Sequence, residues 1–290
     1  MSKYVIIVDS SADLPYELYE KNDIICMPIM YVVEGEEYPD DAGRSMAYTE
    51  FYKRVRGGVS PTTSMINTAV YTEEFEKHLK NGIDILCMPL SSGISGSYNA
   101  AKIAESELRE KYPERKLFVV DSIAASMGHG LLACYAAAHR DNGMPVEELA
   151  KWVEENKRNI IHLFTVDDLM HLQRGGRISK ASAVVGSLIG VKPMLDIDGE
   201  GRLRVHHKKR GRKGALDDLV DWMGESTDLK EFDLIAVSHG DCEADADYII
   251  EKVKGKYKIG KVLKNFIGPV IGSHAGPGTV TLFFMGKERV

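Results

Sequence analysis

Residues 83–111 read IDILCMPLSSGISGSYNAAKIAESELREK, and this stretch decides the fold class. It begins with the apolar run Ile83–Leu90, which is typical of a buried parallel strand. A loop of serines and glycines follows, and after it comes the helical stretch Gly96–Lys111. A strand, a loop and a helix in this order predict one unit of an open α/β sheet.

The same alternation of strand and helix covers the first half of the chain. Short apolar runs that end in Asp, Ser or Pro indicate buried strands, and the longer stretches between them indicate helices. A further helix begins at Pro145, and we place a domain boundary after it, near Ile160. Residues 1–160 are therefore expected to form an α/β domain with a mostly parallel sheet. Its predicted strands are Tyr4–Val8, Ile83–Leu90 and Leu117–Val120, and its predicted helices are Asn67–Lys80, Gly96–Lys111 and Met127–Asp141.

Residues 161–290 follow a different pattern and are expected to form a mixed α+β domain. Met194–Asp198 and Leu203–His207 flank the turn Gly199–Gly201, which predicts a hairpin. The fold class is therefore α/β with two domains. The other predicted elements are helices at Gly214–Met223 and Glu243–Lys254 and strands at Leu234–Ser238, Lys261–Phe266 and Thr279–Met285.

Composition excludes several classes of protein. The hydrophobic fraction of 44% and the charged fraction of 28% are typical of a soluble globular protein with a core large enough for a cavity. The formal net charge of −6 argues against non-specific binding of nucleic acid. The apolar run Val5–Val8 is too short for a signal peptide or a membrane span. The four cysteines form no CxxC pair, so we expect reduced thiols, no metal site and a cytoplasmic protein.

Three polar segments have a composition that a packed core does not need. The first is Ser60-Pro61-Thr62-Thr63-Ser64, in which a proline stiffens the turn and the hydroxyl groups can donate hydrogen bonds to a ligand. The alternative is a helix N-cap, since Ser and Thr are preferred at that position.

The second segment is Ser91-Ser92-Gly93-Ile94-Ser95-Gly96-Ser97-Tyr98, between a predicted strand and a predicted helix. This placement puts backbone N–H groups and the positive helix end around Ser95, which suits an anion. The segment matches neither the Walker A pattern nor the dinucleotide fingerprint. A carboxylate or a simple phosphate is therefore favoured over a nucleotide, and an ordinary strand-to-helix turn is the alternative.

The third segment, Ile271–Thr279, surrounds His274 with three glycines and a proline just before the last predicted strand. A histidine can donate a hydrogen bond to a carboxylate and can become cationic near one. A purely structural histidine is the alternative.

Seven motifs together resemble the DegV family. They occur in that family's order and run from Asp9 to Gly278: DSSADL, SPTTS, LSSGISGSY, VVDS at 119–122, LQRGGRI at 172–178, VKPML at 191–195 and IGSHAGPG at 271–278. The resemblance implies a protein that buries a long-chain fatty acid such as palmitate in a tunnel between its two domains. It also implies a role in lipid metabolism as the binding subunit of a fatty acid kinase. Such a subunit presents the carboxylate to a separate ATP-dependent kinase subunit, performs no catalysis alone and needs no cofactor besides the lipid.

Carried over by motif, the carboxylate ligands are Thr62 or Thr63, Ser95 and His274. The sequence does not decide between the two threonines. Small departures from the family pattern bear on the choice of acyl chain and partner: Ser97 and Ala275 stand where Thr is common, and Gln173-Arg174 replaces a Lys pair. Candidates for the wall of the acyl-chain slot are Ile29, Ile94, Leu188, Ile189, Met194, Phe266 and Ile267, although ordinary core packing explains each of them as well.

Two basic segments are candidates for docking the kinase partner. Arg174 and Arg177 belong to a glycine loop, and Arg202 and Arg204 begin the basic stretch Arg202–Lys213. These cations could contact an acidic kinase surface, or anionic lipid headgroups in a transient contact with the membrane surface. The alternative for both segments is a solvated loop or hairpin.

The main rival function is that of an enzyme. Asp9 and Asp13 follow a strand as in a phosphotransferase aspartate loop, but the DxDxT arrangement is missing. Ser95 and His274 could form a hydrolase dyad, but ISGSY is not the GxSxG elbow that exposes a nucleophile. We expect Asp9 and Asp121 to cap strand-end loops instead. A sugar- or nucleotide-binding regulator is a third alternative.

Overall fold

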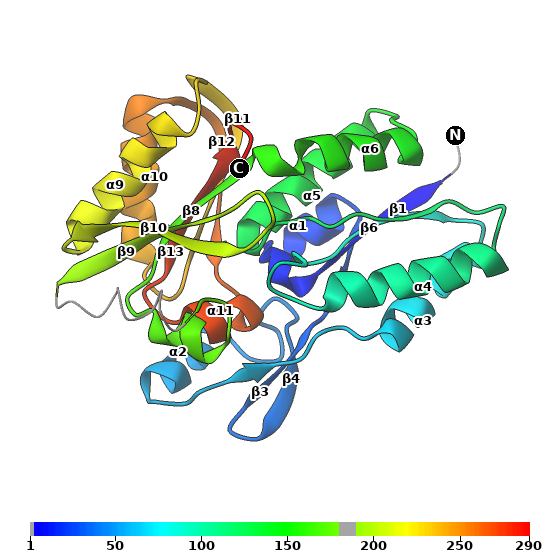
Figure 1. The fold of residues 1–290 in the computed structure, drawn as a ribbon, viewed down its shortest axis with the longest axis horizontal. Helices are drawn as coiled ribbons and strands as arrows, with labels where there is room; N and C mark the ends of the chain where they lie inside the picture. Colours follow the sequence, from blue (N-terminus) through cyan, green and yellow to red (C-terminus); the bar gives the residue numbers. More distant parts are fainter. Residues whose placement is uncertain (1–2, 180–189) are drawn as a thin grey trace.

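The computed structural model describes residues 3–179 and 190–290. The chain forms two lobes that lie side by side, each built on its own sheet (Figure 1). The sheet of the first lobe is entirely parallel, in the order β2-β1-β6-β7. Its strands are β1 (Tyr4–Asp9), β2 (Ile24–Met27), β6 (Asp84–Met88) and β7 (Leu117–Val119).

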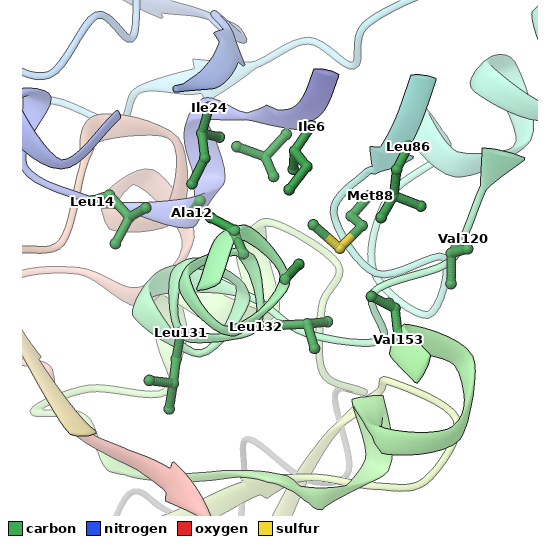
Figure 2. Packing of buried hydrophobic residues seen from close by; sticks show 14 of the residues in the cluster. Ile6, Ala12, Leu14, Ile24, Leu86, Met88, Val120, Leu131, Leu132 and Val153 are labelled. Atoms are coloured by element: carbon green, nitrogen blue, oxygen red, sulfur yellow. The ribbon is translucent and has the colours of Figure 1, made fainter. Parts of the chain in front are cut away.

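Helices cover both faces of this parallel sheet, because its strands are apolar at successive positions. Val5 and Ile7 pack with α3 and α4 on one face, whereas Ile6 and Val8 pack with α5 and α6 on the other, as the twofold repeat of a strand requires. Figure 2 shows Ile6 and neighbouring strand residues directed toward α5. The helices of this lobe are η1 (Ser10–Ala12), α1 (Tyr16–Lys21), α3 (Thr68–Leu79), α4 (Ser97–Lys111), α5 (Ser126–Asp141), α6 (Val146–Asn156) and η2 (Lys157–Asn159).

A small antiparallel sheet adjoins the first lobe. It pairs β3 (Met30–Val33) with β4 (Glu36–Pro39) and with β5 (Thr62–Thr63), and helix α2 (Tyr48–Arg56) packs against it through Phe51. The alternative interpretation of the SPTTS segment as a helix cap is therefore wrong. Its threonines form a strand, and α3 is capped by Asn67, whose Oδ1 accepts a hydrogen bond from the backbone of Val70 at 3.1 Å.

The second lobe contains a six-stranded mixed sheet in the order β10-β9-β8-β13-β11-β12, in which only β11 and β12 are parallel neighbours. This confirms the predicted two-part α/β fold and the predicted hairpin, which is β9–β10. Helices α9 (Arg212–Glu225) and α10 (Glu243–Lys256) cover the face of the sheet that lies to the left in Figure 1. The strands are β8 (Ile160–Thr165), β9 (Val191–Ile197), β10 (Leu203–Arg210), β11 (Glu231–His239), β12 (Lys258–Phe266) and β13 (Val280–Met285).

Helix α5 joins the two lobes. It contacts β1 of the first sheet as well as β8, β11 and β13 of the second, and it lies between the lobes in Figure 1. Ten of its residues are buried, which explains why its sequence is apolar on most sides. The chain passes from one sheet to the other between β7 and β8, and a domain boundary near residue 160 stays our proposal.

Two short helices complete the region between the lobes, α7 (Met170–Arg174) and α11 (Pro269–Ala275). Helix α11 was not expected, because glycine and proline, which surround His274, have low helix propensity. Pro269 starts the helix, where a missing N–H costs nothing. Gly276 ends it with a φ of 79°, in the left-handed region that favours glycine. His274 therefore lies in the last turn of a helix.

Candidate functional site

A cavity of about 260 Å³ lies between the two lobes. Both halves of the chain contribute to its walls, and most of the contributing side chains are apolar. Concave apolar sites with a few convergent polar groups are the usual form of small-molecule sites. The apolar wall residues are Ile29, Met65, Leu90, Ile94, Ala125, Phe164, Leu172, Ile197, Leu203, Ile267, Val270, Ile271, Ala275 and Phe283.

Polar side chains gather at one end of the cavity, which we call the head end. Thr63, Ser95, Arg177 and His274 all line it. Thr63 Oγ1 and His274 Nε2 are 2.9 Å apart and form a hydrogen bond. Arg177 Nε donates to the carbonyl of Ile94 at 3.1 Å, next to Ser95. These groups come from β5, the β6–α4 loop, the residues after α7 and the end of α11, so the fold brings together segments that are distant in sequence.

The structure distinguishes the two threonines of SPTTS. Successive residues of a strand point to opposite faces, and β5 places Thr63 in the wall of the cavity while Thr62 is exposed. Thr62 lines a neighbouring pocket of about 310 Å³ together with Ser60 and Arg174. The two spaces share Thr63, Arg177 and His274. A ligand in the cavity can therefore contact Thr63 directly.

His274 is held as a neutral imidazole. Burial, and next the charge of Arg177, lower the pKa of His274 to about 4. Its Nδ1 is buried and has no hydrogen-bonding partner among the described residues. Because a buried N–H without an acceptor is rarer than a buried acceptor without a donor, we assign the proton to Nε2. Nε2–H then donates to Thr63 Oγ1, which leaves the hydroxyl proton of Thr63 for a ligand.

The close approach of Gly175 to His274 explains one glycine of the LQRGGRI motif. A Cβ added at Gly175 would lie 2.1 Å from His274 Nδ1, far inside van der Waals contact. Any side chain at this position would therefore displace the imidazole. The motif contributes to the head end in two ways, through the space at Gly175 and through the guanidinium of Arg177.

Ser95 is fixed by the start of α4. Its Oγ accepts a hydrogen bond from the backbone N–H of Ser97 at 3.2 Å and donates to Ser97 Oγ at 3.1 Å. The expectation that a helix N-terminus lies beside Ser95 is met, since α4 begins at Ser97. The serine hydroxyl is partly exposed in the cavity wall, where it can turn toward an anion.

The other end of the cavity carries polar groups that are already hydrogen-bonded within the protein. Ser126 Oγ donates to Asp13 Oδ2 at 2.5 Å and lies 2.9 Å from Ser238 Oγ. Thr281 Oγ1 bonds to the backbone and hydroxyl of Ser238, and His162 Nδ1 to a main-chain carbonyl. A ligand that reaches this end of the cavity therefore meets polar side chains whose hydrogen bonds are already made within the protein.

A family model described as an uncharacterised protein of the DegV family matches residues 3–287. This chain belongs to the DegV family. A DegV domain-containing protein of Clostridium perfringens is 41% identical over 289 residues, which is 100% of this chain and 99% of the relative.

Solved structures of DegV proteins have the same fold as this chain. The lipid-binding DegV protein of Thermotoga maritima has a TM-score of 0.87 and 31% identity, over 99% of this chain and 100% of its own. DegV of Bacillus subtilis, described as a fatty-acid-binding protein, has a TM-score of 0.85 and 31% identity over the same shares. The sequence-based recognition of the family is confirmed.

The expected wall residues of this DegV protein are only partly in place. Ile29, Ile94 and Ile267 line the cavity as predicted. Met194 and Phe266 do not; Met194 packs under α9 and α10, and Phe266 packs beside α2. The expectations for Leu188 and Ile189 lie outside the described residues. The missed wall residues include Phe164 on β8, Ile197 on β9 and Phe283 on β13. Thr281 and Phe283 line the cavity at alternate positions of β13, as the twofold repeat of a strand requires.

The four arginines considered for docking fall into two places. Arg177 lies at the head end, and Arg174 lines the neighbouring pocket, where it donates to Ser60 Oγ at 3.2 Å. Arg202 and Arg204 lie at and after the β9–β10 turn and form ion pairs with Glu200 and Asp196. Their role in docking stays a prediction.

Asp9 and Asp121 cap strand-end loops, as expected from the sequence. Asp9 Oδ1 accepts from the backbone of Ser11 at 3.1 Å and Oδ2 from the backbone of Leu90 at 2.7 Å, so it joins two strand-end loops. Asp121 caps a loop in the same way through Ser92 and Ile123. Within residues 3–179 and 190–290, no group of His, Cys, Asp or Glu is arranged to hold a metal. In the same ranges, no helix has both the length and the apolarity that a bilayer span requires.

Proposed function

We propose that this DegV protein binds a long-chain fatty acid, such as palmitate, with the acyl chain in the cavity and the carboxylate at the head end. The observation that carries this proposal is an apolar cavity between the lobes that ends at Thr63, Ser95 and His274. Two DegV relatives, each 31% identical, are described as lipid-binding and fatty-acid-binding proteins, which supports the same ligand class here.

The acyl chain would supply most of the affinity. Each methylene moved from water into an apolar cavity contributes about 0.8 kcal/mol, so about fifteen methylenes gain on the order of 12 kcal/mol before ordering costs. Those costs amount to several kcal/mol. The carboxylate fixes the position of the ligand, because a buried anion is costly unless hydrogen-bond donors surround it.

The donors at the head end suit a carboxylate. Thr63 and Ser95 each offer a hydroxyl proton, and the neutral His274 supports Thr63 from behind. Arg177 adds a positive charge that the three predicted head-group motifs lack, and burial lowers the pKa of its guanidinium. A carboxylate held by neutral donors with one cation nearby is bound reversibly, as a carrier requires.

We further propose that the bound carboxylate is presented to a separate ATP-dependent fatty acid kinase in the cytoplasm, as part of lipid metabolism. The shared lining of the cavity and the neighbouring pocket supports this, because Thr63, Arg177 and His274 border both spaces. Arg174, Arg202 and Arg204 are the side chains proposed to contact that partner or, transiently, a membrane surface. In this proposal the chain is a carrier and performs no catalysis alone.

Mass spectrometry of lipid extracted from freshly purified protein tests the ligand class. We expect a long-chain fatty acid in the organic extract. Palmitate titration of delipidated protein then tests the site with Thr63→Ala, Ser95→Ala and His274→Ala. For Thr63→Ala and Ser95→Ala, loss of a hydrogen bond to a charged group costs about 1.5–3 kcal/mol, which corresponds to about tenfold to hundredfold weaker binding. His274→Ala removes the neutral donor behind Thr63, and its effect should be smaller, at about 0.5–1.5 kcal/mol.

Thr62→Ala is the matched control, because it removes the same groups from the exposed face of β5. It should leave the affinity for palmitate nearly unchanged. Extracts free of fatty acid, together with no measurable binding of palmitate, would refute the proposed ligand. Equal affinities of the Thr63 and Thr62 variants would refute the position of the carboxylate.

A further inference from the structure

Met65 is an exposed methionine in the wall of the cavity. It lies in the loop between β5 and α3 and is 53% exposed, yet it lines the space between the lobes. The other apolar wall residues are buried or half-buried. Met65 therefore has solvent on one side and the cavity on the other, which places it at a mouth of the cavity.

The neighbours of Met65 fix its backbone and leave its side chain adjustable. The backbone N–H of Ser64 donates to a main-chain carbonyl of β3 at 3.0 Å, and Ile66 is buried in the core of the first lobe. The sulfur of Met65 packs over Gly96, since a Cβ added at that glycine would lie 2.6 Å from it. Gly96 follows Ser95, so the sulfur lies beside the head end. A methionine side chain is flexible and fills such gaps without a fixed geometry.

The cysteine thiols react poorly with oxidants. The thiolate, rather than the thiol, is the form of cysteine that peroxides oxidise. Burial raises the pKa of Cys26 and Cys242 to about 12 and that of Cys134 to about 11, and it raises the pKa of Cys87 as well. These four thiols therefore stay protonated near neutral pH.

Two methionines are accessible to an oxidant in solvent. Within residues 3–179 and 190–290, Met65 is 53% and Met170 is 47% exposed, whereas the other methionines are buried or half-buried. A thioether is oxidised without prior deprotonation, so exposure of the sulfur governs its reaction with peroxide. Met170 begins α7 and does not line the cavity. The two residues therefore differ in position rather than in accessibility.

We propose that Met65 is an oxidation site at which hydrogen peroxide lowers the affinity of the protein for its fatty acid. This inference rests on the proposed function. The sulfur attacks one oxygen of the peroxide with a lone pair; an S–O bond forms and the O–O bond breaks. The departing hydroxide takes the proton from the oxygen on sulfur and leaves as water. The sulfur is oxidised to a sulfoxide, and the peroxide is reduced.

The sulfoxide changes the mouth of the cavity in two ways. It replaces an apolar group that covers the acyl chain with a polar one, which is unfavourable wherever the ligand excludes water. Its oxygen accepts hydrogen bonds and donates none, so it adds an acceptor beside Ser95, where a carboxylate needs donors. Because Met65 is half in solvent, the sulfoxide can turn partly toward water. We therefore expect a loss of affinity of about three- to tenfold rather than a loss of binding.

The test compares palmitate affinity before and after oxidation of the same protein. Delipidated wild type, Met65→Leu and Met170→Leu are each treated with hydrogen peroxide, and peptide mass spectrometry measures the oxidation of each methionine. Leucine has a similar volume and cannot form a sulfoxide. After oxidation, the wild type and M170L should bind palmitate about three- to tenfold more weakly. M65L should bind palmitate equally well before and after treatment.

Two measurements on the wild type need no variant. Palmitate bound before treatment should slow the oxidation of Met65, because the acyl chain covers one side of it, and should leave the oxidation rate of Met170 unchanged. Methionine sulfoxide reductases, supplied with a thiol reductant, should restore the affinity of the oxidised protein, because they regenerate the thioether.

Equal losses of affinity in the wild type and M65L would overturn the oxidation site and leave the proposed function intact. Oxidation of Met65 that is no faster than that of the buried methionines would have the same meaning. Failure of the untreated wild type to bind palmitate would overturn both the oxidation site and the proposed function.

Discussion

Replacing His274 with glutamine should remove one specific part of the protein's sensitivity to acid. Burial, and next the charge of Arg177, lower the pKa of His274 from 6.5 to about 4. Between these pH values the unfolded chain binds a proton that the folded chain does not. The free energy of unfolding therefore falls as the pH is lowered from about 6.5 toward about 4. Glutamine does not titrate, so the variant lacks this contribution.

The size of the effect follows from the difference between the two pKa values. A difference of about 2.5 pH units, at about 1.36 kcal/mol for each, gives a loss on the order of 3 kcal/mol by pH 4. Other groups titrate in this range, and some act in the opposite direction. Burial raises the pKa of Asp40 to about 7, so this carboxyl stabilises the fold on acidification. Subtracting the variant from the wild type removes such shared contributions.

Urea unfolding of delipidated protein, followed by circular dichroism at several pH values between about 7 and about 4, measures this difference. We expect wild-type protein to lose on the order of 3 kcal/mol more than H274Q over the range. If the free energy of unfolding fell by the same amount with pH in both proteins, the buried imidazole would not resist protonation. The assignment of a neutral His274 at the head end would then be wrong.

Three further predictions concern packing around the cavity. Gly175→Ala should displace His274 and weaken palmitate binding about tenfold in a titration, whereas Gly214→Ala, which adds a Cβ in open space, should not change it. Ala125→Leu should fill part of the cavity end that lies opposite the head end. Competition between fatty acids of different length should then favour the shorter chains, by about 0.8 kcal/mol of binding free energy for each methylene that no longer fits. Asp13→Ala removes the acceptor of the Ser126 hydroxyl, which keeps Ser238 as a partner, and leaves the backbone N–H of Gly268 without its acceptor; urea unfolding should show a loss of about 1–3 kcal/mol.

The regular elements of the parallel sheet could be predicted because their signals are local. Strand Tyr4–Asp9 and helix Ser126–Asp141 each differ from their predicted bounds by one residue at one end. Strand Ile160–Thr165 was missed because it follows a helix directly, at the position assigned to the domain boundary. The strands of the small sheet were missed because they have only two or four residues, and β4 begins with two exposed glutamates.

The head end could be predicted in its residue types but not in its geometry. Ser95 and His274 stand out because glycines surround them, and the motif order relates them to Thr62 and Thr63. The choice of Thr63 depends on strand alternation in a segment with hydroxyl groups on both faces. Arg177 reaches the cavity from a segment remote in sequence, which no local pattern indicates. Wall residues have the same composition as core residues, so the sequence cannot separate them.

The hollow between the lobes has a consequence for the lifetime of the protein. The hollow of about 260 Å³ is lined mostly by apolar side chains, and a ligand that covers them removes apolar surface from water and stabilises the loaded form. A cargo molecule would therefore complete the interior as a missing side chain would. The unloaded form would open more often and be degraded sooner, which links the abundance of such a carrier to its lipid supply.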